Sequence, residues 1–176
     1  MNTVPLAGPV VYFNFQKAVP GNADVFTYAM LGDVDQLKHL FNNGLAPPND
    51  VNFDSGVTAL PIAVSHRKIR ACKYLLSVNA DPFLEDKVQL KAADNAWEKI
   101  LARFLPPQTE RALCSIFSET ECIEPREFTL LHKIVLGLLP NDLEQYLQGS
   151  TADINGRDTN HRTPISPSPQ TAATSA

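Results

Sequence analysis

An apolar pattern that recurs about every 34 residues is the feature that most limits how this 176-residue chain can fold. In the first copy, Val34, Leu37, Leu40 and Phe41 are spaced so that they share one face of a helix. The later copies are Ile69, Cys72, Leu75 and Leu76, then Leu113, Ile116 and Phe117, then Leu143, Tyr146 and Leu147. One such helix cannot bury its apolar face alone, so the period predicts units that stack on their neighbours.

Two further markers share this period. Thr58, Thr129 and Thr163 lie 71 and 34 residues apart, and each precedes a helix-like stretch. The dipeptides Ala80-Asp81 and Ala152-Asp153 follow the second and fourth copies. We therefore expect each unit to consist of a turn, a short helix, a tight turn, a longer helix and a loop.

These units resemble the ankyrin repeat, whose unit is about 33 residues long and opens its first helix with Thr-Pro-Leu-His. That opening is represented by Thr58-Ala59-Leu60-Pro61, Thr129-Leu130-Leu131-His132 and Thr163-Pro164-Ile165-Ser166. The end of the unit is represented by Leu75-Leu76-Ser77-Val78-Asn79-Ala80-Asp81, with Asn in place of the usual Gly. The block Phe128–Leu138 is also similar to divergent repeats of fungal ankyrin-repeat proteins. The resemblance implies an all-α fold, an ankyrin-like α-solenoid of stacked helix-turn-helix repeats joined by hairpin-like loops.

We expect three segments along the chain: an N-terminal extension over 1–23, the repeat array over 24–165 and a tail over 166–176. The array holds about four repeats and the start of a fifth. Its third repeat, about 88–121, is degenerate, because it lacks the threonine opening and has an insertion at 104–109. Prolines in that insertion must lie between helices or in a first helical turn. The tail is almost entirely Ser, Thr, Pro and Ala, which predicts disorder.

Charge and cysteine usage limit the class of protein. The net charge is −4, with 15 basic and 19 acidic residues, which argues against a nucleic-acid binder. The basic stretch 66–73 is expected to occupy a turn and the solvent face of a helix. Three cysteines are typical of a reduced intracellular protein.

No segment approaches the roughly 18 consecutive apolar residues of a membrane span. The apolar run Pro9–Phe13 is not preceded by the basic residues of a secretory signal, and we expect it to dock on the first repeat. The expected location is therefore cytoplasmic or nuclear, without contact with a membrane.

Cys114, Cys122 and His132 are the best candidates for metal ligands, but their spacing matches no common zinc pattern. The resemblance implies that His132 packs between neighbouring repeats. The sequence contains none of the common short motifs of a serine nucleophile, a zinc protease or a phosphate-binding loop. We therefore expect no catalytic residue, no metal and no cofactor.

The resemblance implies a non-catalytic module that binds another protein along a concave surface of loop tips and first helices. The residues that occupy the loop positions are Asn52, Phe53, Asp54, Leu84, Glu85, Asp86, Lys87, Gly156, Arg157 and Asp158.

Two other functions stay open. The chain could be a regulatory or truncated segment of a larger enzyme or signalling protein, or a degenerate helical enzyme domain. A fifth unit opens at Asp158–Ile165 and is not continued, so the last full repeat lacks a polar cap. End-to-end self-association through that repeat is therefore a further expectation.

Overall fold

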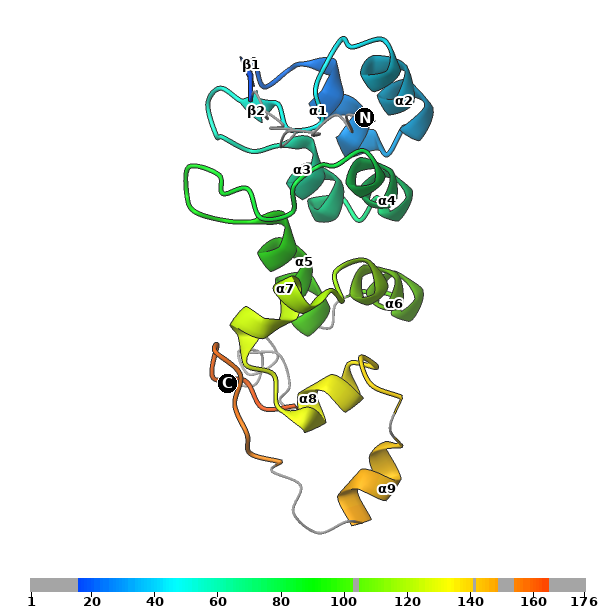
Figure 1. The fold of residues 1–176 in the computed structure, drawn as a ribbon, viewed down its shortest axis with the longest axis vertical. Helices are drawn as coiled ribbons and strands as arrows, with labels where there is room; N and C mark the ends of the chain where they lie inside the picture. Colours follow the sequence, from blue (N-terminus) through cyan, green and yellow to red (C-terminus); the bar gives the residue numbers. More distant parts are fainter. Residues whose placement is uncertain (1–15, 103–104, 141, 149–153, 165–176) are drawn as a thin grey trace, which may run out of the picture.

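A computed structural model describes residues 16–102, 105–140, 142–148 and 154–164 of the chain. The apolar run 9–13 and the expected tail 166–176 lie outside these residues. The described helices follow one another along a single long axis, as Figure 1 shows.

Three helix pairs form the first part of the stack. They are α1 (Asp24–Leu31) with α2 (Val34–Asn42), α3 (Ala59–Ser65) with α4 (Ile69–Ser77), and α5 (Ala92–Leu101) with α6 (Pro107–Ile116). The first helices of the pairs pack in one row, α1 on α3 on α5, and the second helices pack in another, α2 on α4 on α6. We call these the inner and outer rows. This arrangement confirms the predicted all-α solenoid.

The helices begin and end where local chemistry requires. Gly44 and Asn79 follow two outer helices with left-handed φ angles of 64° and 63°. The next residue in each case donates its amide to a carbonyl five residues back, which closes the end of the helix. Asn79 thus takes the conformation that Gly44 takes one unit earlier. Pro106 and Pro107 lie at the N-terminal cap and first residue of α6, as predicted.

The core runs between the two rows of helices. Trp97 is completely buried, and its indole nitrogen donates to the carbonyl of Phe117 at 3.2 Å. The ring of Phe128 meets Trp97 edge-on, with the ring centres 5.3 Å apart. This contact joins the third unit to the fourth.

The fourth unit differs from the first three. A short helix, α7 (Thr120–Ile123), and a 3-10 turn, η1 (Glu124–Arg126), precede α8 (Leu130–Val135) and are not expected from the repeat pattern. The outer helix α9 (Leu143–Gln148) has no buried residue. The equivalent helices α2, α4 and α6 each bury apolar side chains.

Two short strands tie the start of the described chain to the first loop. β1 (Ala18–Val19) and β2 (Val51–Asn52) pair in parallel, with Ala18 opposite Val51. The Asp50 carboxylate accepts the amide of Lys17 at 3.3 Å beside this pair. The last residues of the predicted extension therefore join the loop edge of the stack.

The described helices are short, and the longest have ten residues. Within the described ranges, no helix has both the length and the apolar character needed to cross a bilayer.

Candidate interaction surface

Three loops end in turns of similar construction, which we call fingers. Finger 1 is 52–57, finger 2 is 86–90 and finger 3 is 158–162. In fingers 2 and 3, one carboxylate oxygen of the first residue accepts the amides two and four residues further on. The distances are 2.9 and 2.9 Å for Asp86, and 2.9 and 2.8 Å for Asp158. In finger 1, the side-chain oxygen of the first residue, Asn52, accepts the amides two and three residues further on. These side-chain bonds hold each finger in one conformation.

The main chain also connects the fingers to their neighbours. In each finger the second residue donates its amide to a carbonyl of the preceding loop or turn. These bonds are Phe53 N to Val19 O at 2.8 Å, Lys87 N to Ser55 O at 3.0 Å, and Thr159 N to Arg126 O at 3.1 Å. The fingers therefore form a row along one edge of the stack, held by bonds that do not depend on side-chain type.

Apolar side chains stand out from fingers 1 and 2. Phe53 is 68 % exposed, Val88 is 79 % exposed and Leu90 is 41 % exposed. The ammonium of Lys87 donates to the Phe53 carbonyl at 2.8 Å and lies 5.7 Å from the centre of its ring. The cation thus restrains the aromatic side chain while leaving most of its surface open to solvent.

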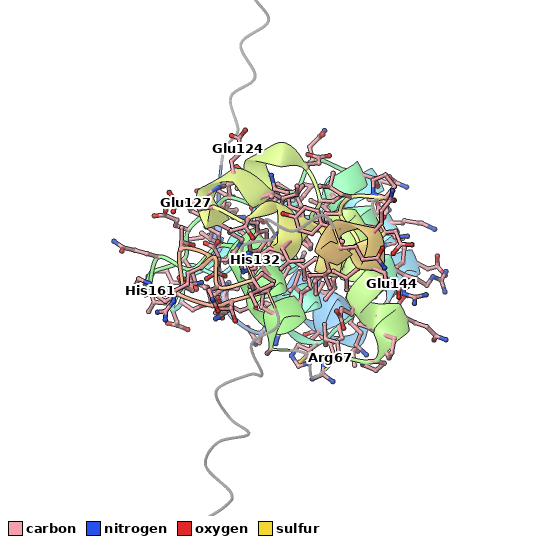
Figure 2. All side chains as sticks on the ribbon, turned by 90° about the horizontal axis from the view of Figure 1, so that it is seen from below. Arg67, Glu124, Glu127, His132, Glu144 and His161 are labelled. Carbon is pink, nitrogen blue, oxygen red and sulfur yellow. The ribbon has the colours of Figure 1, made fainter. Side chains whose placement is uncertain are left out.

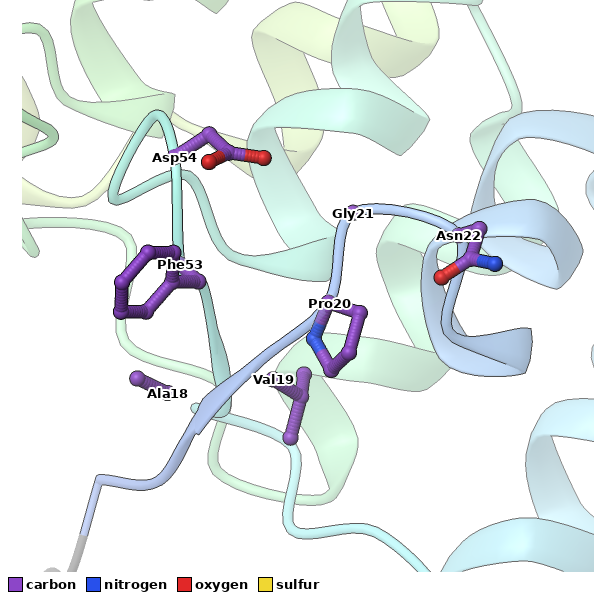
Figure 3. A pocket seen from close by; sticks show the side chains of 7 residues that line it. All are labelled: Ala18, Val19, Pro20, Gly21, Asn22, Phe53 and Asp54. Carbon is purple, nitrogen blue, oxygen red and sulfur yellow. The ribbon is translucent and has the colours of Figure 1, made fainter.

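An open hollow of about 590 Å³ lies between finger 1 and the start of the described chain. Figure 3 shows its lining, which includes Phe53 and Asp54 from finger 1 and Ala18, Val19 and Pro20 from β1 and the residue after it. Among the described residues, no hydrogen bond or ion pair engages the Asp54 carboxylate. The hollow is thus a largely apolar surface with one free negative charge at its edge.

The joint between the third and fourth units is polar as well as aromatic. The Arg126 guanidinium is buried, 2.6 Å from the Asp94 carboxylate and 5.9 Å from the centre of the Trp97 ring. Burial lowers the pKa of Arg126, while the charges of Asp94 and Glu98 act in the opposite direction. Glu98 also accepts a hydrogen bond from Arg162 at 2.7 Å. The sequence analysis did not predict these contacts of Arg126 and Glu98. The one feature of the sequence that indicates them is the spacing of Asp94 and Arg126, which is about one repeat period.

Thr129 caps α8 together with His132. The threonine hydroxyl lies 2.7 Å from His132 Nδ1, and the His132 amide donates back to that hydroxyl at 3.3 Å. His132 Nε2 lies 3.0 Å from the carbonyl of Arg162, thirty residues later. A carbonyl only accepts, so Nε2 carries the proton and Nδ1 accepts in the neutral ring. Figure 2, viewed along the stack, places His132 near the middle of the molecule.

Residues 25–76 match the family model described as ankyrin repeats, many copies. This segment carries ankyrin repeats. No curated protein matches it significantly. The likeness of Phe128–Leu138 to fungal repeats stays a prediction.

The other two threonines of the repeat pattern differ from Thr129 in their contacts. Thr58 occupies the N-cap position of α3, as Thr129 does for α8, but Pro61 stands where the fourth unit has His132. The buried Thr58 hydroxyl consequently has no hydrogen-bond partner among the described residues. Thr163 directly follows finger 3 and is the neighbour of Arg162, whose carbonyl His132 binds. In the second ankyrin unit, Leu75 is buried in the core and Leu76 packs against it, whereas Leu147 on α9 is exposed.

The predicted loop residues fall into two groups. Phe53, Asp54, Glu85, Lys87 and Arg157 are exposed, and Glu85 pairs with Lys91 at 3.2 Å. Five others have structural roles or little exposed surface. Asn52, Asp86 and Asp158 hold the finger turns, and Gly156 is buried. Leu84 is half-buried.

The three cysteines of the chain are buried. Burial raises the pKa of Cys72 to about 12, and burial followed by the charge of Glu110 raises the pKa of Cys114 to about 11. Within the described residues, no group of three His, Cys, Asp or Glu side chains is placed to hold a metal ion. His132 is occupied by Thr129 and Arg162, as the family resemblance implied.

Proposed function

We propose that this ankyrin array binds a protein partner, without catalysis, through the exposed edge of its fingers and the adjoining side of the inner helices. Ankyrin repeats are generally protein-interaction modules. The observation that carries the proposal is the exposure of Phe53, Val88 and Leu90 on two neighbouring fingers. Large apolar side chains on a rigid scaffold are typical anchors of an interface.

The hydrogen bonding of the fingers supports this function. Each finger is closed by side-chain bonds and tied to the preceding loop or turn through its main chain. A surface held in this way loses little conformational entropy when a partner binds. The expected binding mode is therefore docking onto a preformed surface.

The proposed contact set keeps the exposed predicted residues Phe53, Asp54, Glu85, Lys87 and Arg157, and adds Val88 and Leu90. It leaves out Asn52, Asp86 and Asp158, because these side chains maintain the turns. Half-buried Leu84 and buried Gly156 supply little surface and are also omitted.

An affinity capture from a lysate of the source cells, read by mass spectrometry, tests the proposal. The wild type is compared with a Phe53→Ala, Val88→Ala double variant. The matched control is Leu31→Ala, Leu45→Ala, which removes two apolar side chains that are also mostly exposed and lie outside the fingers. A partner retained by wild type and control but lost by the folded finger variant supports the proposal. A partner retained by all three locates binding elsewhere.

The second candidate function is that of a regulatory segment within a larger enzyme or signalling protein. End-to-end self-association through the last repeat belongs to this candidate. Exposed Leu130 and Leu147 in the fourth unit favour contacts beyond the array. Sedimentation of the wild type and a Leu130→Lys variant tests self-association. A wild-type dimer that dissociates in the variant supports it, and a wild-type monomer at every concentration contradicts it.

The proposed location is a reducing compartment, the cytoplasm or nucleus. Cys72 and Cys114 are buried thiols outside any disulfide, which supports this location. Imaging of a tagged chain tests it, and a secreted product would contradict it.

A further inference from the structure

The second unit carries a concentration of positive charge. Between Asp54 and Asp81 the sequence has no acidic residue. The basic residues of this stretch are Arg67, Lys68, Arg70 and Lys73. Four basic residues and no acidic one give residues 55–80 a formal charge of +4, opposite in sign to the net charge of −4 of the whole chain. Among the described residues, none of these four side chains forms an ion pair.

Arg67 lies at a backbone position that favours glycine. It belongs to the turn between α3 and α4 and has a left-handed φ of 57°. The corresponding position after α1 is Gly32, and after α8 it is Gly137, with φ angles of 79° and 69°. In all three turns the next residue donates its amide to a carbonyl five residues back. The second unit thus has a long cationic side chain where the first and fourth units have none, in a conformation that residues other than glycine adopt at a cost.

The exposed Arg67 side chain lines an open hollow of about 320 Å³ beside α5. Lys99, in the last turn of α5, lines the same hollow. Ala102 and Leu105 supply its apolar lining. The hollow therefore combines two cations with a small apolar surface.

The carboxylate of Glu98 also lines the hollow, but it already has partners. It accepts a hydrogen bond from the Arg162 guanidinium at 2.7 Å and another, on its second oxygen, from the Asn160 amide at 3.3 Å. Arg162 thus offsets the charge of Glu98. The charges of Arg67 and Lys99 remain, because neither side chain has an ion-pair partner among the described residues.

Hydrogen bonds hold the elements around the hollow in place. The Asn95 amide on α5 donates to the Ser65 hydroxyl at 2.7 Å and to the Pro61 carbonyl at 3.5 Å, both on α3. These bonds fix the start of the α3–α4 turn against α5. A ligand that binds here therefore meets a largely preformed site.

Positive charge continues from the hollow along the outer helices. Arg70 on α4 and Arg111 on α6 are exposed, and each lies two residues before a buried core position of its helix. They therefore occupy equivalent places on neighbouring helices. Figure 2 shows Arg67 at the margin of the molecule, on a different side from His161 of finger 3. This cationic surface is thus separate from the fingers.

We propose that Arg67 and Lys99 bind a carboxylate, and that the ligand is an acidic segment of a partner protein. The planar guanidinium of Arg67 pairs with both carboxylate oxygens, and the Lys99 ammonium adds a point charge. Further acidic residues of the segment lie along Arg70 and Arg111. The site uses different residues from the fingers, so it can fail while the proposed function holds, and the reverse.

Charge and surface chemistry favour an acidic protein segment over a nucleic acid. The net charge of −4 repels an extended polyanion at long range. Single-stranded nucleic acids also stack their bases on exposed aromatic rings. Among the described large hydrophobic side chains, the exposed aromatic one is Phe53, which lies on finger 1 and not on this surface.

Fluorescence anisotropy tests the site with a labelled peptide of alternating Glu and Ser. A peptide of alternating Gln and Ser is the uncharged probe, and the salt concentration is about 50 mM, where exposed charges are weakly screened. The full chain is compared with an Arg67→Gly, Lys99→Gln variant, which we call the turn variant. Glycine suits the left-handed backbone at position 67, so this variant should fold at least as well as wild type.

The matched control is Arg157→Gly, Lys87→Gln, which removes one arginine and one lysine from finger 2 and the segment before finger 3. Wild type should bind the Glu peptide at least about tenfold more tightly than the Gln peptide, as expected for an ion-paired ligand. The turn variant should lose at least about tenfold in affinity for the Glu peptide, and the control less than about twofold. Raising the salt to about 0.2 M should weaken wild-type binding several-fold. Circular dichroism establishes that each variant is folded.

Three results would overturn the proposal. Equal affinity of the turn variant and wild type for the Glu peptide would mean that Arg67 and Lys99 do not bind the carboxylate. An equal loss in the turn variant and the control would mean that overall charge, and not a site, attracts the peptide. An oligothymidylate that binds wild type more tightly than the Glu peptide would make a nucleic acid the ligand.

Discussion

The guanidinium of Arg126 lies 2.6 Å from the carboxylate of Asp94, which joins the fourth unit to the first helix of the third. Arg126 is buried, whereas Asp94 is nearly half exposed. Asp94→Ala leaves a buried cation without its partner, so we expect a loss of about 2 kcal/mol in the free energy of unfolding. Arg126→Met removes the charge itself and should cost less. Urea unfolding followed by circular dichroism measures both.

The control for this pair is Asp35→Ala, which breaks the exposed ion pair between Asp35 and Lys38. Exposed pairs contribute about 0.5 kcal/mol or less. If Asp94→Ala costs no more than this control, the Arg126 network does not hold the fourth unit in place.

One substitution at two equivalent threonines should have opposite effects. Thr58→Val removes a buried hydroxyl that has no partner, so stability should stay equal or rise by up to about 1 kcal/mol. Thr129→Val leaves the ring nitrogen and amide of His132 without the threonine hydroxyl, and should cost about 1 to 3 kcal/mol. Thermal and urea unfolding of the two variants provide the comparison. An equal loss at both positions would show that the Thr58 hydroxyl has a partner in solution.

The buried carboxylate of Asp50 makes stability depend on pH. Burial raises the pKa of Asp50 above its ordinary 3.8, although the amide and charge of Lys17 act in the opposite direction. The folded chain therefore holds this proton more tightly than the unfolded chain. The contribution of Asp50 to stability is complete below pH 3.8 and is lost as the pH rises through the folded pKa.

Asp50→Asn should accordingly raise the melting temperature at neutral pH and have little effect below pH 3.8. Lys17 and Asp24 line the same cavity as Asp50 and stay unchanged in this variant. Melting curves across the pH range give the measurement, with exposed Asp54→Asn as the control. A variant less stable than wild type at neutral pH would mean that the ionised carboxylate is the favoured form.

Phe53 should matter for binding and little for folding. Its side chain is mostly exposed, so Phe53→Ala should change the free energy of unfolding by about 0.5 kcal/mol or less. The same substitution should weaken binding of the captured partner at least about tenfold, the effect of losing an interface anchor. Titration calorimetry measures the affinity, with Leu45→Ala as the matched control. Equal affinity of the Phe53→Ala and Leu45→Ala variants for the partner would show that Phe53 is not part of the interface.

Periodicity alone predicts most of the stack. The recurring apolar positions locate α2, α4 and α6, and the threonines at 58 and 129 mark the starts of α3 and α8. These elements are predictable because each depends on contacts within a unit or with the next one. The left-handed Asn79 is predictable for the same reason, since a helix end is a local structure.

The missed elements depend on contacts that carry no residue signature. The pairing of Ala18 with Val51 is a main-chain interaction, open to almost any residue type. The α7 segment occupies the place of a loop and follows no repeat position. The exposed position of α9 could not be read from Leu143 and Leu147, because their pattern is the same as in a buried helix.

The candidate surface is predictable by position but not by role. Sequence placed Asp86 and Asp158 at finger tips, yet both carboxylates turn inward to bind finger amides. The sequence did contain a signal for this turn-closing role. Asp86 and Asp158 lie 72 residues apart, about two repeat periods, and each is the first residue of its finger. Val88 and Leu90 were overlooked because exposure of an apolar side chain depends on which way the turn points.

The bonds that Phe53, Lys87 and Thr159 make from each finger to the preceding strand, finger or turn use only main-chain atoms. Their donors and acceptors are present whatever side chain a non-proline residue carries. Mutation can therefore replace the outward residues of the row while the scaffold beneath keeps its form. A lineage of such chains could exchange one partner for another through a few substitutions at the tips, without first passing through an unstable intermediate.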